Sequence, residues 1–557
     1  MKHSIFGVKI AVFFALCALA ATISAKGKHE IRAVWLTTIG GLDWPHYYAQ
    51  STASAEKQKK EFTDMLDRLR LAGINTVLLQ TRVRATTVYP SAIEPWDGCM
   101  SGRPGLSPGY DPLAFAVEEC HRRGMELHAW VVSIPIGKWN NYGCRRLRKA
   151  RPDLVKRIGD EGFIDPEKPA AASYIASICA EITSNYDIDG IHLDYIRYPE
   201  TWKGRIDHVK GRANITRIVR STTETVKRLK PWVKMSCSPV GKHDDLSRFS
   251  SYGWNARTKV CQDAQQWLAD GLMDQLYPMM YFRGNQFYPF AIDWKENVHG
   301  GSVAPGLGIY FLSPREKDWD VEIIRRQLHF LRDEGLGQAF FRCKFLLDNV
   351  KGIYDLVSDE VNVYPSLVPP LVSATPLPQP PRDLVLQRVN GTDRLSWTSD
   401  KPWPQSDGMY HLFNIYASTT YPVDTSDPAN LLASRLQSTS LDVPTPSGMK
   451  PLHYAVTSTD RFSRESSAVT TAAPSSSCGS RHDNMLRCDG TTLFLPPVAT
   501  DAAYLAVEST VGNIVTTRPY AATVDVSTVP DGFYVARTLN RKGTAHRLGF
   551  FIINRKQ

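Results

Sequence analysis

One carboxylate in this sequence has the type and position that acid–base or nucleophilic chemistry needs. Residues 186–199 read YDIDGIHLDYIRYP, with Asp189 ahead of a strand-like run and Asp194 at its end. Because side chains alternate along a strand, His192 and Asp194 share one face. With that face inward, Asp194 reaches one end of the strand, His192 lies one layer below, and Asp189 lies at the opposite end. The alternatives are a helix N-cap or an ion pair with Arg197 for Asp194, and a hydrogen-bonded core position for His192.

The elements that would position Asp194 alternate between strand-like and helical runs from residue 31 to about 356. The predicted strands are 31–37, 75–82, 126–133, 189–194, 233–238, 273–281, 304–310 and 338–343. Helical spacing of apolar residues marks 56–72, 112–123, 170–186, 212–230, 260–270 and 320–334. Eight strands with helical crossovers imply a parallel sheet, and this length favours a closed (β/α)₈ TIM barrel. In such a barrel, catalytic groups project from the carboxyl ends of the strands.

Several segments of this region resemble one bacterial family, in the family's own order. They are EIRAVWLTTIGGLDWP (30–45), GINTVLLQTRVRATTVYPS (73–91), the run from FIDPEKP to GIHLDYIRYP (163–199) and LMDQLYPMMYF (272–282). Over residues 30 to about 360 the chain is similar to the bacterial glycosyl-hydrolase-like family ten, formerly a domain of unknown function. The resemblance implies a barrel that acts on glycosidic bonds, with bacterial cell-wall glycan as a substrate class. It assigns no catalytic pair.

Hydrolysis of a glycosidic bond normally uses two carboxyl groups, one to protonate the leaving oxygen and one to attack or to activate water. With Asp194 as the first, we predict Asp165 in FIDPEKP as the second, because its loop can arch over the barrel mouth. A helix N-cap is the alternative for Asp165. Asp43 after the first strand and Glu94 after the second are further candidates. Asp274 begins the sixth strand and is expected at the barrel bottom.

Polar and aromatic side chains near the predicted strand ends are candidates for substrate contacts. Arginine can bind a carboxylate or hold Asp194 ionised, while glutamine and tyrosine can hydrogen-bond to sugar hydroxyls. Aromatic rings can stack on the apolar faces of sugars. The predicted substrate-binding residues are Gln80, Arg82, Arg84, Trp130, His192, Arg197, Tyr198, Gln275, Tyr277, Tyr281, Trp35 and Asp43. For each arginine a structural salt bridge is the alternative, and for each aromatic residue a core position.

The chain beyond the barrel changes to short strands spaced by turn residues. The expected parts are a signal peptide at 1–25, the barrel at 27–363, a proline-rich linker at 364–382, a β-sandwich at 383–474 and a small C-terminal β domain at 475–557. The sandwich is similar to a fibronectin type III module, above all over PLHYAVTSTDRFSRESSA (451–468).

The N-terminus has the pattern of a secretory signal, with Lys2 and Lys9 beside an apolar run and small residues before position 26. The run is too short to span a membrane comfortably, although an uncleaved anchor is the alternative. We therefore expect export to the periplasm or the cell surface, where disulfides can form.

Ten cysteines include one in the signal segment, so nine remain and cannot all pair. The pair expected first is Cys478–Cys488, and Cys99–Cys144 is a second candidate. The cysteines expected as buried thiols are Cys120, Cys179, Cys237 and Cys343.

The composition of the chain restricts the classes of possible binding partner only weakly. Among 557 residues, 43% are hydrophobic and 22% charged, which are ordinary values for globular domains. The formal charge of +10 is a mild bias toward anionic partners such as cell-wall polymer. No basic stripe indicates nucleic acid binding, and no ligand spacing, phosphate loop or nucleophile elbow indicates a metal or cofactor.

These observations predict an exported glycoside hydrolase that cleaves a polysaccharide, with peptidoglycan glycan as the first substrate and the cell envelope as a place of association. The alternative from another class is a non-catalytic carbohydrate-binding or cell-surface scaffold protein, which the appended β-rich parts would fit equally well. A deacetylase or other esterase would need a metal site or a nucleophile–base pair that the sequence does not show.

Overall fold

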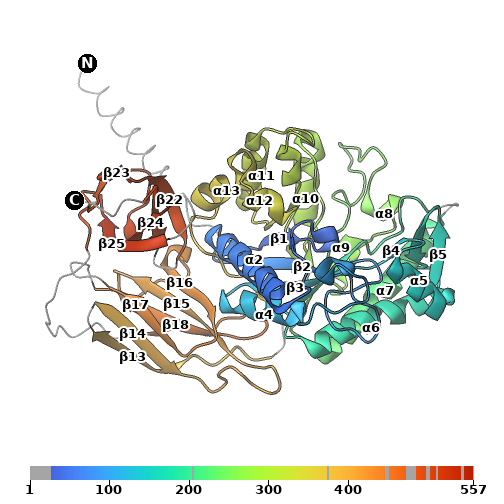
Figure 1. Cartoon of the computed structure of the whole chain (residues 1–557), viewed down its shortest axis with the longest axis horizontal. Helices are drawn as coiled ribbons and strands as arrows, with labels where there is room; N and C mark the ends of the chain where they lie inside the picture. The colour runs from blue at the N-terminus through green and yellow to red at the C-terminus, as the bar shows by residue number, and fades with distance from the viewer. Residues whose placement is uncertain are drawn as a thin grey trace, which may run out of the picture.

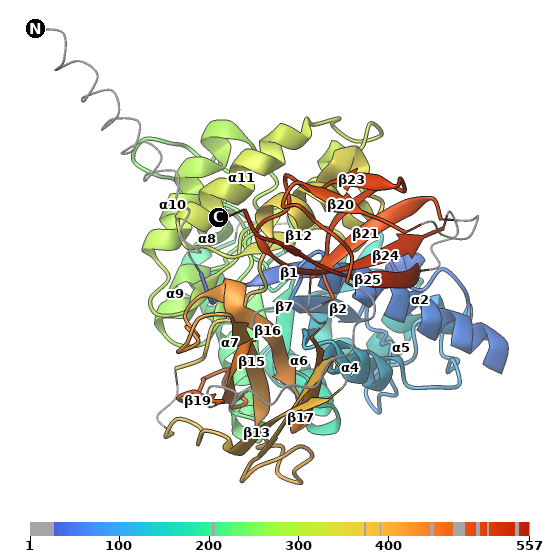
Figure 2. The same ribbon diagram turned by 90° about the vertical axis from the view of Figure 1, so that its left-hand side faces the viewer.

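The computed structural model of the chain contains a barrel and two β-rich parts. It describes residues 27–202, 206–372, 375–389, 391–445, 451–471, 485–496, 502–509, 512–540 and 545–555. The barrel takes up one side of the molecule, and the two β-rich parts lie together on the other (Figure 1). From that other side, both parts are seen in front of the barrel (Figure 2). The expected signal peptide lies outside the described residues.

The barrel strands are parallel and follow one another in order around the sheet. They are β1 (Arg32–Leu36), β2 (Thr76–Arg82), β3 (Glu126–Val132), β7 (Gly190–Asp194), β8 (Lys234–Cys237), β9 (Gln275–Leu276), β10 (Ser302–Val303), β11 (Gly306–Leu307) and β12 (Gln338–Phe340). The sheet order is β10-β9-β8-β7-β3-β2-β1-β12-β11. It therefore begins and ends on two segments that are neighbours in the chain.

β10 and β11 are two pieces of one strand, and they close the sheet. Only Ala304 and Pro305 separate them. β10 pairs with β9, β11 pairs with β12, and Gly306 also bridges to Met279 beyond β9. Eight parallel strands thus surround one interior, which confirms the predicted α/β barrel.

The sixth and seventh strands are shorter than their predicted runs, 273–281 and 304–310. Pro278 and Pro305 lie within these runs and lack the backbone N–H that a sheet ladder requires. The seventh strand also begins two residues earlier than predicted, and the end of its run becomes a 3₁₀ helix at Ile309–Leu312.

Helices cover the barrel between the strands. They are α2 (Thr52–Leu71), α4 (Pro112–Arg122), α6 (Ala170–Asn185), α7 (His208–Leu229), α9 (Ala264–Ala269), α10 (Tyr288–Glu296), α11 (Val321–Asp333) and α12 (Cys343–Leu347). Local sequence explains their ends: Asp111 caps α4 by accepting from the N–H groups of Leu113 and Ala114, and Gly124 follows the helix at φ 70°. The six predicted helices are present, and α10 and α12 are additions.

An insertion after β3 carries one predicted catalytic residue. It contains β4 (Pro135–Lys138), α5 (Tyr142–Ala150), β5 (Val155–Ile158) and β6 (Glu161–Ile164), whose strands form a separate antiparallel sheet in the order β4-β6-β5. Asp165 directly follows β6. No strand or helix was predicted between residues 134 and 169, so the insertion was not expected.

The part after the linker consists of two sheets that share a core. One sheet contains β13 (Arg382–Val389), β14 (Thr392–Thr398) and β17 (Ser440–Pro444). The other contains β16 (Leu431–Leu436), β15 (Leu412–Ser418), β18 (His453–Thr459) and β19 (Val469–Thr470). Trp397 of the first sheet and Phe413 and Tyr454 of the second belong to one buried cluster. We call this part the sandwich; its likeness to a fibronectin type III module stays a prediction.

The C-terminal part has its own strands and core. It pairs β20 (Thr492–Phe494) with β23 (Thr523–Asp525), and orders β22 (Ile514–Pro519), β21 (Tyr504–Ser509), β24 (Gly532–Leu539) and β25 (Ala545–Ile553) in a second sheet. Leu505, Val507 and Phe551 are fully buried there, in a cluster separate from that of the sandwich.

The sandwich contacts the barrel bottom through a buried charge network, which we call the floor network. Lys234 Nζ lies 2.5 Å from Glu126 Oε1 inside the barrel end. Arg435, from strand β16 of the sandwich, reaches both Glu126 at 3.0 Å and Asp189 at 2.6 Å, and His121 lies 2.8 Å from Asp189. Arg435 itself has φ 56°, a conformation that non-glycine residues adopt rarely.

The cations of the floor network keep its acids ionised. Burial alone would raise the pKa of Glu126, but the charges of Lys234 and Arg435 outweigh it, and the net pKa is lowered. The same holds for Asp189, where His121 and Arg435 hold the pKa well below its ordinary value against the effect of burial. Asp189 is therefore a structural anion at the barrel bottom.

The structure confirms the predicted buried thiols and contradicts one of the two predicted disulfides. Cys120, Cys179, Cys237 and Cys343 are buried thiols, as predicted. The Cys99–Cys144 pairing is wrong, because both are free and buried, and the Cys144 sulfur instead packs over the Cα of Gly162. The Cys478–Cys488 pair cannot be placed, since Cys478 lies outside the described residues. Across the described ranges, no helix is both long and apolar enough to cross a membrane.

Candidate functional site

Strand β7 places Asp194 at the mouth of the barrel. The strand pairs with β3 so that Asp194 lies opposite Val132, the last residue of β3. The Asp194 carbonyl accepts from the N–H of Ser133, which is already in the following insertion. Asp194 is thus the last ladder residue of its strand, at the carboxyl end.

The Asp194 carboxylate is surrounded by uncharged donors. Trp130 Nε1 donates to Oδ2 at 3.1 Å, and Ser238 Oγ and the Tyr195 N–H donate to Oδ1 at 2.7 and 2.8 Å. Asp194 is only 6% exposed. Burial raises its pKa, and although these hydrogen bonds and the charge of Arg197 oppose the rise, the net shift is upward. Such a carboxyl keeps its proton to a higher pH than an ordinary aspartate, which suits a proton donor.

Tyr195 forms the exposed edge of the site. It has φ 50°, a left-handed conformation that costs energy for a bulky residue and is found preferentially at functional sites. Its ring is 39% exposed and lies under the Arg197 guanidinium, 4.6 Å from the guanidinium carbon to the ring centroid. Arg197 in turn forms an ion pair with Glu200, 2.6 Å from Nη2 to Oε1.

The layer beneath Asp194 is a closed hydrogen-bonded core. Trp35 Nε1 donates to His192 Nε2 at 3.1 Å, and His192 Nδ1 lies 3.0 Å from Ser236 Oγ. Tyr277 meets His192 edge-on and donates to Gln275 Oε1 at 2.9 Å. Burial holds the pKa of His192 well below its ordinary value, so the imidazole stays neutral. Trp35, His192, Gln275 and Tyr277 therefore lie below the mouth and support it rather than line it.

The predicted substrate-binding residues of β2 separate into two kinds. Arg82 is fully buried, where it pairs with Glu94 at 2.7 and 2.8 Å and donates to the Ser133 carbonyl at 3.0 Å. This is the structural salt bridge that the sequence left open. Gln80 Oε1 accepts from the N–H groups of Thr38 and Ile39 and so holds the loop after β1. Arg84, by contrast, is exposed and lies over Gly137.

Asp43 is also bound into the scaffold. Its Oδ2 accepts from the Thr37 N–H at 2.8 Å. Its Oδ1 lies 2.5 Å from Arg342 Nη1 and accepts from the Lys344 N–H at 2.9 Å. The carboxylate is fully buried and ties the end of β1 to the segment after β12.

Asp165 and Asp274 hold backbone N–H groups at opposite ends of the barrel. Asp165 Oδ1 accepts from the Glu167 N–H at 3.0 Å in the turn before helix α6. The N-cap position of that helix is Pro169, so the helix N-cap alternative for Asp165 is wrong. Asp274 accepts from the Met235 N–H at 2.7 Å and pairs with Lys227, at the start of strands β8 and β9, as expected for the barrel bottom. The structure shows no contact between Asp165 and Asp194.

The two remaining predicted tyrosines differ in environment. The Tyr198 hydroxyl accepts from Asn214 at 3.1 Å, and its buried ring packs edge-on against Trp202. Tyr281 packs between Phe341 and Tyr310, and its pKa is raised by burial and then by the charge of Asp194. Tyr281 therefore belongs to the surroundings of Asp194, whereas Tyr198 belongs to the neighbouring helix packing.

Glu200 is the residue at the mouth that the sequence analysis missed. It follows Arg197 at a spacing of three, immediately after the motif used to find Asp194. That spacing beside a strand end is the local signal that could have identified Glu200.

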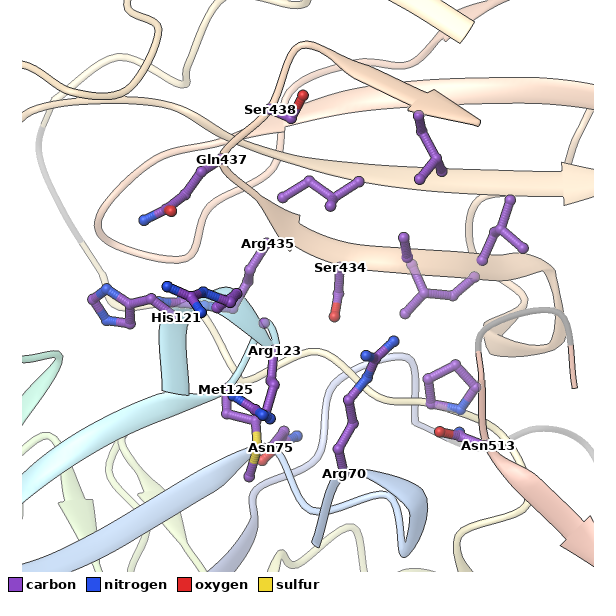
Figure 3. Close-up of a pocket in the computed structure, with 18 of the residues that line it drawn as sticks. Arg70, Asn75, His121, Arg123, Met125, Ser434, Arg435, Gln437, Ser438 and Asn513 are labelled. Carbon is purple, nitrogen blue, oxygen red and sulfur yellow. The ribbon is translucent and has the colours of Figure 1, made fainter. Parts of the chain in front are cut away.

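A cavity of about 710 Å³ lies at the other end of the barrel, between its bottom, the sandwich and the C-terminal part. Arg70, Arg123 and Arg435 point into it together with Asn75 and Ser434 (Figure 3). Arg123 pairs with Asp67 and Glu119, and Arg435 belongs to the floor network. Arg435 thereby joins the sandwich to the barrel bottom, whereas the ion pairs of Arg123 lie within the barrel, between helices α2 and α4. Within the ranges that the structure describes, no group of three or more His, Cys, Asp or Glu side chains is arranged to hold a metal ion.

Comparison with known proteins gives one family and several relatives. The profile of the family described as "Glycosyl hydrolase-like 10" matches residues 30–210 and 207–306. "Glycosyl hydrolase YngK" of Bacillus subtilis (strain 168) is 29% identical over 493 residues, which are 80% of this chain and 93% of the relative. "Glycosyl hydrolase DigH" of Escherichia coli (strain K12) is 31% identical over 339 residues, 53% of this chain and 77% of the relative.

Among solved structures, the glycoside hydrolase domain of PgaB (BpsB) from Bordetella bronchiseptica is similar with a TM-score of 0.40 and 12% identity. The match covers 60% of this chain and 99% of that domain.

Proposed function

The chain belongs to the glycosyl hydrolase-like 10 family, and on that premise we propose that it is an exported glycoside hydrolase in which Asp194 donates a proton to the glycosidic oxygen. The family and the names of its relatives support a glycosidase-type function. The observation that carries the catalytic role is the surroundings of Asp194, a mouth carboxyl that is buried among neutral donors.

The proposed substrate is a bacterial polysaccharide, with peptidoglycan glycan first. The mildly basic chain favours an anionic polymer such as cell wall. Export to the periplasm or the cell surface belongs to this proposal, as does a role of the sandwich and the C-terminal part in spacing or attaching the barrel at the envelope. A fibronectin type III character of the sandwich is supported by its two sheets of three and four strands around one core.

The other residues of the mouth have proposed roles that follow from their positions. Exposed Arg84 and Tyr195 are placed to contact a sugar chain directly. Trp130 and Ser238 hold the Asp194 carboxyl, and the layer containing His192 supports it from below. No metal or cofactor enters the proposed reaction, in which water is the co-substrate.

The test is incubation of the mature chain with purified peptidoglycan sacculi and a panel of polysaccharides, with soluble products identified by mass. We expect fragments from sacculi, and a loss of about 10²–10⁴-fold in release rate for Asp194→Asn. Asp160→Asn is the matched control, because Asp160 is an exposed aspartate far along the insertion whose ion pair, among the described residues, is with Lys138. Glycan binding with no cleavage of any substrate would instead establish the alternative, a carbohydrate-binding scaffold.

A further inference from the structure

The ion pair between Arg197 and Glu200 has no part in the function proposed so far. Arg197 is buried at the mouth, and its Nη2 lies 2.6 Å from Glu200 Oε1, while the Glu200 side chain remains 36% exposed. Arg197 Nε is buried without a hydrogen-bond partner among the described residues. The pair therefore joins a buried guanidinium to a carboxylate that reaches into solvent.

The Arg197–Glu200 pair lies beside Asp194, and Tyr195 connects the two. The Arg197 guanidinium covers the Tyr195 ring, and the Tyr195 N–H donates to Asp194. The charge of Arg197 lowers the pKa of Asp194 against the larger effect of burial. The pKa of Tyr195 is raised by burial, then by Asp194, and also by Glu200, so both carboxylates lie near one phenol.

Glu200 differs from the other acids considered for the second role. Asp43 and Glu94 are buried in ion pairs with Arg342 and Arg82, and Asp165 accepts from a backbone N–H. The contacts of these three acids hold the barrel and its loops together. The described contact of Glu200 is with a residue of the mouth itself.

We propose that Glu200 is the second catalytic carboxyl, the general base that activates water for an inverting hydrolysis. This rests on the proposed function. As the Asp194 carboxyl protonates the leaving glycosidic oxygen, the bond from that oxygen to C1 breaks. A water oxygen attacks C1 from the opposite face, and Glu200 takes the proton that this water loses. Asp194 ends ionised and Glu200 protonated, and exchange with solvent resets both.

Inversion, rather than retention, is the stereochemical outcome that a general base at Glu200 requires. The Asp194 oxygens are occupied by Trp130, Ser238 and the Tyr195 N–H, and among the described residues Arg197 donates to Glu200 and not to Asp194. Inverting enzymes keep their carboxyls roughly 6.5–9.5 Å apart, which leaves room for the attacking water.

The experiment compares Glu200→Gln with wild type on purified sacculi. The expected result is a loss of about 10²–10⁴-fold in the rate of fragment release, together with loss of the acidic limb of the rate–pH profile. Sodium azide should restore turnover of Glu200→Gln, because azide attacks C1 without a base. The product would be a glycosyl azide of inverted configuration, identified by mass and by proton NMR.

Glu118→Gln is the matched control, since Glu118 forms an exposed pair with Arg122 at the same 2.6 Å on helix α4. It should leave the release rate unchanged. Near-normal activity in Glu200→Gln, or wild-type products that retain the anomeric configuration, would overturn the assignment while leaving the proposed function intact. A wild-type chain that cleaves neither sacculi nor any polysaccharide of the panel would overturn both.

Discussion

Two aspartates five residues apart, Asp189 and Asp194, have opposite surroundings at the two ends of strand β7. At about 3.3 Å per residue they are separated by roughly 17 Å. Both are buried. Asp189 at the bottom meets Arg435 and His121, and its pKa is held well below the ordinary value. Asp194 at the mouth meets Trp130, Ser238 and a backbone N–H, and burial raises its pKa.

The difference shows that the charge of the neighbouring groups, and not burial alone, decides whether the pKa of a buried carboxylate is lowered or raised. Cations fix Asp189 as an anion that holds the sandwich to the barrel, so its charge contributes to stability. Neutral donors orient Asp194 without outweighing its burial, so this carboxyl keeps its proton to a higher pH than an ordinary aspartate does. The predictions below alter one end at a time.

The largest effect on folding is expected from Arg435→Met. The change leaves Glu126 and Asp189 without their shared guanidinium and should lower the free energy of unfolding by about 3–5 kcal/mol. Chemical denaturation measures it. Arg394→Met is the matched control in the same sandwich, because Arg394 pairs with Asp442 on the exposed surface. It should cost no more than about 1 kcal/mol, and equal losses from both variants would contradict a special role for the floor network.

A smaller effect is expected on the pH dependence of stability. The lowered pKa of Glu126 means that its contribution is fully present above its ordinary pKa of 4.5 and is lost as the pH falls toward about 2. The free energy of unfolding of wild type should therefore decrease over this window, and Glu126→Gln should flatten the decrease. An unchanged slope in the variant would show that Glu126 does not carry this dependence.

The smallest effect is expected at the mouth, from Ser238→Ala. The Ser238 hydroxyl favours the ionised form of Asp194, so its removal should raise the Asp194 pKa further. The basic limb of the rate–pH profile should move up by about 1 pH unit, which corresponds to about 1.4 kcal/mol. Ser236→Ala is the matched control two residues earlier in the chain, because Ser236 contacts His192 instead. A downward shift would show that Asp194 does not act as the acid.

Sequence periodicity was sufficient for the barrel and for the position of Asp194. Alternation along GIHLD put Asp194 at the mouth and His192 below it, and helical spacing located the covering helices. The prolines that shorten the sixth and seventh strands, Pro278 and Pro305, are visible in the sequence and could have predicted the shorter strands. The insertion after β3 was missed, because its strands are only four residues long and pair with one another rather than with the barrel.

The spacing of residues along the sequence could not predict which side chains contact each other in the fold. Arg82 meets Glu94 and Asp43 meets Arg342 through contacts 12 and 299 residues apart in sequence, respectively. Arg435 joins the floor network from another part of the chain, and nothing in its local sequence marks it. The contact between Arg197 and Glu200 differs from these, because a spacing of three residues can be recognised in the local sequence.

The measurement that tests the central claim most directly is fragment release from sacculi per folded molecule for Asp194→Asn beside Asp189→Asn. The account predicts that Asp194→Asn folds with an unfolding midpoint near that of wild type and loses about 10²–10⁴-fold in rate. It predicts that Asp189→Asn is less stable but releases fragments at the wild-type rate once corrected for the folded fraction. An active Asp194→Asn, or a folded but inactive Asp189→Asn, would contradict the division of roles between the two ends of the strand.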